Sequence, residues 1–163
     1  MTGVQTCALP ISSAFPLWLT AFFSSGESSA VVRLISGMDA GLVPYSVMVE
    51  QSSSYSSGIE LIRQARREYP QLDGVFCTND DLAVGAAFEC QRLGLKVPDD
   101  MAIAGFHGHD IGQVMEPRLA SVLTPRERMG SIGAERLLAR IRGESVTPKM
   151  LDLGFTLSPG GSI

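Results

Sequence analysis

The 163-residue sequence lacks any apolar run approaching the roughly 18 residues that a membrane-spanning helix needs. Cysteine is scarce: three residues without paired spacing exclude a disulfide scaffold or a zinc site of Cys pairs and fit the reducing cytosol. Charged residues make up only 18%, and the net charge of −4 provides no basic footprint for DNA or RNA. The composition therefore predicts a cytoplasmic globular protein, with no membrane contact and no nucleic-acid surface of its own.

Motifs for covalent catalysis, zinc hydrolysis and dinucleotide binding are also missing. The sequence contains no G-x-S-x-G, no H-E-x-x-H and no G-x-G-x-x-G. Cys77 and Cys90 fall on a predicted strand and helix, where packing is the expected role. We therefore expect a protein that is not an enzyme and that carries no metal or other cofactor.

The first part of the chain differs in character from the rest. Residues 1–30 carry a single charge, Glu27, and Gly3–Ile11 resembles the conceptual translation of a common sequencing-library adapter. Such segments are excluded from reasoning about the fold. We predict that residues 1–39 are foreign or artefactual, with a weak helix over 31–35, and that residues 40–163 form the native part.

The native part alternates short apolar runs with amphipathic segments. Strands are predicted over 45–50, 74–78, 101–106, 119–123 and late in 150–157. Helices are predicted from a capping box at Ser57 to Pro70, from Asn79 or Asp80 to Leu93, over 109–115, and over 126–142. This order predicts an α/β fold with a doubly wound, mostly parallel sheet. The last helix is expected to turn one face inward, made of Met129, Ile132, Gly133, Leu137 and Ile141.

Polar residues gather where the predicted strands end, and ligands of such sheets bind beyond the carboxyl ends of the strands. Thr78–Asp81 is either a helix cap with an acidic first turn or a place where the Asn79 amide faces a ligand. His107–Asp110 has three interpretations: a metal site, a solvated turn with His109 near a helix start, or a cleft in which His107 binds an anion.

Several motifs together resemble the lactose/galactose-repressor family of bacterial transcription factors. They are DGVFCTNDDLAVGA at Asp73–Ala86, LGLKVPDD at Leu93–Asp100, IAGF at Ile103–Phe106, and the helix from Met129 to Gly143. The resemblance covers about residues 40–163. It implies the C-terminal subdomain of a periplasmic-binding-protein-like effector domain, incomplete at its N-terminal side and without the helix-turn-helix DNA-binding domain.

The resemblance also implies a function. Gly105–Asp110 is similar to the same segment in the family's gluconate-responsive repressors, so the expected effector is gluconate or a related aldonate. Many relatives have Asp where this chain has His107, and a carboxylate there would repel a sugar acid. The full-length protein is expected to be a homodimeric repressor that contacts operator DNA only through the missing domain.

Family positions carry over to individual residues of this sequence. The resemblance implies effector contacts from Asn79, His107, Thr124, Arg126, Ser53 and Tyr55, and a dimer surface that includes Val84 and Met115. Two alternatives stay open: a periplasmic sugar-binding protein of similar fold, and a metal-dependent hydrolase that uses His107, His109 and Asp80.

Overall fold

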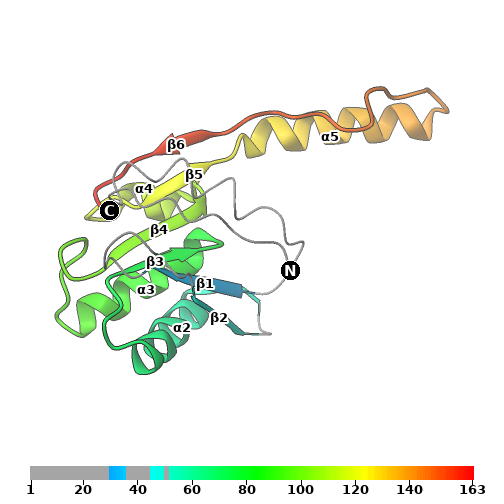
Figure 1. Ribbon diagram of the computed structural model, residues 1–163. Coiled ribbons are helices and arrows are strands. Elements are labelled where there is room, and N and C mark those ends of the chain that lie inside the picture. The colour runs from blue at the N-terminus through cyan, green and yellow to red at the C-terminus, as the bar shows by residue number, and fades with distance from the viewer. Residues whose placement is uncertain (1–29, 36–44, 50–51) are drawn as a thin grey trace, which may run out of the picture.

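The computed structural model describes residues 30–35, 45–49 and 52–163 (Figure 1). The strands are β1 (Ala30–Ile35), β2 (Tyr45–Val49), β3 (Gly74–Cys77), β4 (Ala102–His107), β5 (Ala120–Leu123) and β6 (Thr156–Ser158). The helices are α2 (Tyr55–Glu68), α3 (Asp80–Arg92), α4 (Asp110–Val114) and α5 (Arg126–Ile141). No helix within these residues is both long and apolar enough to cross a membrane.

The described strands form one sheet in the order β2-β1-β3-β4-β5-β6. Strands β3, β4 and β5 run parallel at its centre, as the alternation of strands and helices predicts. β1 pairs antiparallel with β2 and β3, and β6 pairs antiparallel with β5. The helix predicted over 31–35 is wrong, because this segment is β1. Its β-branched residues suit a strand, and ladder bonds on both sides satisfy its backbone.

The main core lies between the central strands and helices α2 and α3, which pack against each other (Figure 1). A Cβ on Gly58 would lie 2.2 Å from the Leu82 carbonyl oxygen, and one on Gly85 would lie 2.1 Å from that of Tyr55. The two glycines therefore permit a close approach of the helix backbones. The buried side chains here include Leu61, Ile62, Ala65, Val75, Ile103 and the two predicted core cysteines, Cys77 and Cys90.

At the starts of α2 and α3, side-chain oxygens accept hydrogen bonds from free backbone amides. Helix α2 begins at Tyr55, so the capping box predicted at Ser57 is wrong: the Oγ of Ser54 accepts from the Ser57 N–H at 3.1 Å. The Oγ of Ser57 instead donates to the Ser52 carbonyl oxygen. Asn79 caps α3, and Gly94 follows that helix with φ +74, both as predicted.

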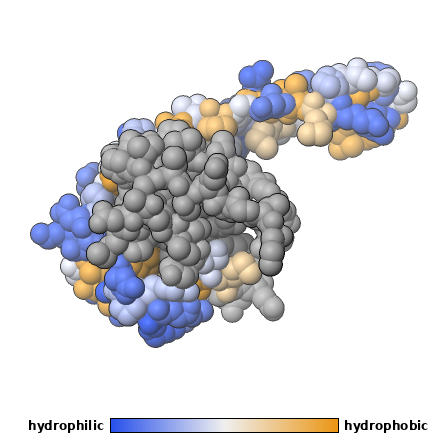
Figure 2. All heavy atoms as spheres, in the orientation of Figure 1, coloured by the Kyte–Doolittle hydropathy of each residue, from blue (hydrophilic) through white to orange (hydrophobic). Residues whose placement is uncertain are grey.

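Helix α5 does not have the inward face that its spacing predicts. It contains no buried residue, and Ile141 is 73% exposed. In Figure 1, α5 extends away from the sheet, and Figure 2 shows hydrophobic residues along the part of the molecule that contains it. The sequence of α5 is amphipathic, but none of the described elements packs against its apolar side.

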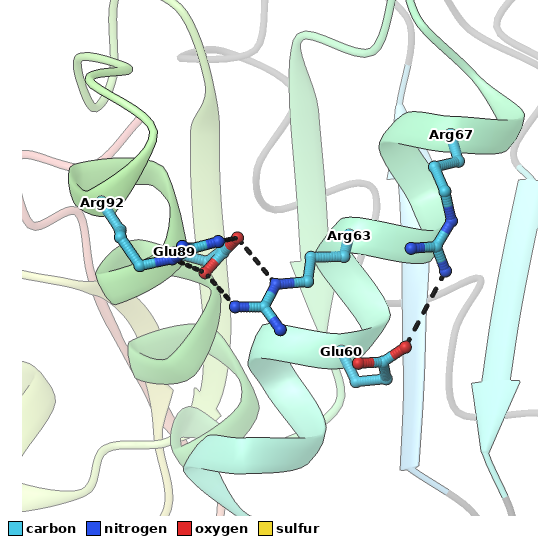
Figure 3. A network of polar contacts seen from close by, with 5 residues as sticks. All are labelled: Glu60, Arg63, Arg67, Glu89 and Arg92. Carbon is cyan, nitrogen blue, oxygen red and sulfur yellow. Dashed lines mark hydrogen bonds and ion pairs between the residues drawn. The ribbon is translucent and has the colours of Figure 1, made fainter.

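One charged side chain lies inside the contact between α2 and α3. Glu89 is 1% exposed and accepts two hydrogen bonds from Arg63, at 2.8 and 3.1 Å, and two from Arg92, at 2.8 and 2.6 Å (Figure 3). The guanidinium groups lower the pKa of the Glu89 carboxyl to about 2, with Arg92 the larger cause. The carboxylate therefore stays charged and joins the two helices.

Candidate functional site

Three of the predicted polar segments meet at one edge of the sheet. Because β3, β4 and β5 are parallel, the residues that follow them come out on the same side. Hydrogen bonds then connect the start of α3, the turn His107–His109 and the segment from β5 into α5. This edge is the candidate site.

The carbonyl groups of the His107–His109 turn are held from the β5 side. Thr124 donates through Oγ1 to the His107 carbonyl oxygen at 3.4 Å. Arg126 donates through Nη2 to the Gly108 carbonyl oxygen at 3.1 Å. The structure thus brings Thr124 and Arg126 to the turn and gives each a contact with its backbone, while their contact with an effector stays a prediction.

His107 has an unusual backbone and a half-buried ring. Its φ is +98, a conformation that only a few residue types other than glycine adopt readily. Its imidazole packs edge-on against Phe106, with ring centroids 4.5 Å apart, and stacks on His109 at 5.8 Å. Burial lowers the pKa of His107 below its usual value, and His109 lowers it further. The lowered pKa favours the neutral ring, which offers one donor and one acceptor.

Asn79 and Asp81 sit opposite this turn at the start of α3. The Asn79 Oδ1 accepts from the Asp81 N–H at 2.6 Å, so the capping interpretation is confirmed. The Asp81 carboxylate also contacts the His109 Nδ1 at 3.0 Å. The oxygen of Asn79 is used for the cap, which leaves its amide nitrogen as the group that a ligand would meet.

Ser53 precedes α2, and Tyr55 is the first residue of that helix. β2 points in the same direction as β3, and β1 lies between them. A Cβ on Gly85 of α3 would lie 2.1 Å from the Tyr55 carbonyl oxygen, so the start of α2 lies beside α3. Among the described residues, no hydrogen bond joins either side chain to the His107–His109 turn.

The described residues do not support the metal-site interpretation of this turn. Within the described residues, no group of three His, Cys, Asp or Glu side chains is arranged to hold a metal ion. Both oxygens of Asp80 face inward, where they accept from the Ser121 hydroxyl and the His109 N–H. Asp80 therefore cannot act with His107 and His109 as a ligand set.

The two dimer positions implied by the family resemblance differ in exposure, because Val84 is buried and Met115 is partly exposed. Val84 is fully buried in the core, and Met115 packs against the same core cluster. Val84 lies on the face of α3 that packs into the core, and this position explains its burial. Val84 therefore has the core role that an apolar residue at this position also allows, while the dimer surface of the full-length protein stays a prediction.

Ser121 is a site residue that the sequence reasoning missed. It is fully buried in β5, between Ala120 and Val122. The available signal was a hydroxyl inside a short apolar strand, since a buried polar group requires a partner. The partner, Asp80, is 41 positions earlier in the chain, and no local pattern pairs the two.

The comparison with known families decides what kind of chain this is. A family described as "Periplasmic binding protein-like domain" matches residues 28–163. The chain belongs to this family. The matched range begins at residue 28 and so includes part of the segment predicted to be foreign, and that boundary stays a prediction.

Several proteins that the chain resembles are transcriptional regulators. The chain is 99% identical over 126 residues to the HTH-type transcriptional regulator GntR of Escherichia coli strain K12, covering 77% of this chain but only 38% of that protein. The crystal structure of transcription regulator GntR from Chromobacterium violaceum has 41% identity and a TM-score of 0.64, covering 69% of this chain and 42% of that one. A CelR–cellobiose complex has 32% identity and a TM-score of 0.64, covering 68% and 34%. The resemblance to the lactose/galactose-repressor family is confirmed.

Proposed function

We propose that this chain is the effector-binding part of a cytoplasmic repressor of gluconate-metabolism genes, with no enzymatic activity. The supporting observation is the near-identity to an HTH-type regulator over 126 residues. The chain spans 38% of that regulator, and operator binding is proposed for the full-length protein. Homodimerisation is likewise proposed for the full-length protein.

The chemistry of the site supports an anionic effector. Arg126 supplies a permanent positive charge beside the turn, and the half-buried His107 ring supplies a hydrogen-bond donor. The Asn79 amide adds a donor suited to the hydroxyl groups of a sugar acid. Charge-assisted hydrogen bonds from such groups to a carboxylate are about twice as strong as neutral ones.

Burial favours the neutral form of His107, and an anion next to the imidazole should raise its pKa and favour uptake of a proton. Affinity for gluconate is then highest at low pH, where the bound form holds the proton, and falls as the pH rises through the pKa of the bound state. A flat affinity between pH 5.5 and about 8 would contradict this role of His107.

Calorimetric titration of the full-length regulator with D-gluconate tests the proposal, with D-glucose as the neutral counterpart. We expect binding of gluconate over glucose. His107→Asp should weaken gluconate binding at least ~10-fold, because like charges ~4 Å apart repel by up to ~4 kcal/mol at an effective dielectric of 20. Arg126→Gln should also weaken it, whereas Arg128→Gln removes the same charge from an exposed position of α5 and should not. Absence of gluconate binding by the unchanged protein would refute the proposal.

A further inference from the structure

Asp80 is fully buried, and its carboxylate packs against β4 at a glycine, where a side chain would leave no room for it. It lies in the first turn of α3, and a Cβ on Gly105 of β4 would be 2.3 Å from its Oδ1. Burial raises the pKa of Asp80, while hydrogen bonds from Ser121 and from the His109 N–H oppose that rise. Burying a carboxyl group is energetically unfavourable compared with burying an apolar side chain of similar size, so its hydrogen bonds indicate a structural or functional role.

The hydrogen bonds of Asp80 lead to two consecutive backbone amides. Its Oδ2 accepts from the His109 N–H at 2.5 Å. Its Oδ1 accepts from the Ser121 hydroxyl at 2.7 Å, and the same Ser121 Oγ accepts from the Gly108 N–H at 3.3 Å. Both amides that follow His107 are therefore fixed by one buried pair.

This pair lies where the turn needs support. His107 has φ +98, which is unfavourable for a residue with a side chain, so surrounding contacts must hold it there. The carbonyl groups of the turn bond to Thr124 and Arg126, which are themselves candidate ligand contacts at the edge of the site. The amides instead bond to buried groups that a ligand cannot reach.

We infer that Asp80 and Ser121 are positioning residues, which hold the His107–His109 turn so that the His107 imidazole faces the effector. The inference rests on the proposed function where it concerns gluconate. It predicts that removal of the Ser121 hydroxyl moves both histidine rings and weakens binding, although neither residue touches the effector.

Ser121→Ala is tested against Ser162→Ala, a matched control. Ser162 is also fully buried, and its Oγ bonds to the Ile103 carbonyl oxygen and the Ala120 N–H, with no recorded bond to the turn. The 163-residue chain has only two histidines, so NMR resolves both imidazoles directly. Calorimetry with D-gluconate on the full-length regulator supplies the second measurement.

We expect Ser121→Ala to shift the imidazole signals of both histidines and to weaken gluconate binding at least ~5-fold, with neither change in Ser162→Ala. Asp80→Asn, which can still accept from His109 and donate to Ser121, should restore most of the affinity that Asp80→Ala loses. Equal effects of Ser121→Ala and Ser162→Ala, or unchanged signals in Ser121→Ala, overturn the inference. If the unchanged regulator does not bind gluconate, the proposed function fails, and the imidazole signals alone decide whether the turn is positioned in this way.

Discussion

Replacing Glu89 with glutamine measures the charged contact that joins α2 and α3. The change keeps the shape of the side chain but replaces one accepting oxygen with an NH2 group. Of the four hydrogen bonds from Arg63 and Arg92, the amide can retain about two, and its NH2 group would face guanidinium N–H groups. The variant therefore removes part of the network without opening a cavity.

The size of the effect follows from burial and bond count. Hydrogen bonds to charged groups contribute ~1.5–3 kcal/mol each, but water can replace part of what the two arginines lose because they reach the surface. We expect Glu89→Gln to lower the free energy of unfolding by about 2 kcal/mol. With a urea dependence of ~1–3 kcal/mol per molar, the unfolding midpoint should fall by roughly 1 M.

The same region contains a control on the surface. Glu60 and Arg67 of α2 are 3.8 Å apart, with side chains 58% and 66% exposed (Figure 3). Such pairs contribute little, so Glu60→Gln should change stability by less than ~0.5 kcal/mol. If Glu89→Gln costs no more than Glu60→Gln in urea unfolding at pH 7, the argument from burial is refuted.

The pH dependence provides an independent check with a definite sign. The pKa of Glu89 is lowered from 4.5 to about 2 in the folded chain. The stabilisation is therefore fully present above pH ~4.5 and is lost as the pH falls toward 2. The difference between the unchanged chain and Glu89→Gln should shrink over that window. A difference that stays constant down to pH 2.5 would contradict the pKa shift.

Three further predictions concern packing, thiol reactivity and DNA. Gly58→Ala should destabilise the chain by at least ~1–3 kcal/mol in urea unfolding, because its Cβ would overlap the Leu82 carbonyl, whereas Gly130→Ala, with open space around it, should stabilise it by ~0.5–1 kcal/mol. Burial raises the pKa of both the Cys77 and the Cys90 thiols, the latter to about 11, so mass spectrometry should find them alkylated at pH 8 only after denaturant is added. Rapid alkylation in the native state would contradict this. The 163-residue chain should produce no operator-selective mobility shift, and a salt-dependent shift would show that a DNA surface was overlooked.

Local signals predicted the elements whose stability is itself local. The cap at Asn79 and the positive φ at Gly94 follow from residue type and position alone. The parallel centre of the sheet follows from the order of strands and helices along the chain. β1 was mispredicted as a helix because a short apolar run is compatible with either a helix or a strand. Its pairing with β2 and β3 determines that it is a strand.

Features that depend on distant partners could not be predicted. The inward face expected for α5 assumed a neighbour that the described elements do not provide. Residue Val84 was assigned to a surface by analogy, although its burial depends on the packing of α3 against the sheet. At the site, the sequence suggests His107 and Arg126 as candidate contacts, but the Asp80–Ser121 pair joins α3 to β5 through contacts that no spacing rule encodes.

The backbone of His107 restricts which amino acids that position can change to over evolutionary time. Among residues with a side chain, His, Asn and Asp are the types enriched at positive φ, and φ here is +98. In the genetic code, each His codon is one nucleotide change from an Asp codon and from an Asn codon. Because buried groups hold the amides of the turn, we expect such a change to leave the turn in place while it replaces the imidazole with an amide or a carboxylate. A lineage can therefore move between an imidazole, an amide and a carboxylate at this position in single mutational steps, without rebuilding the structure around it.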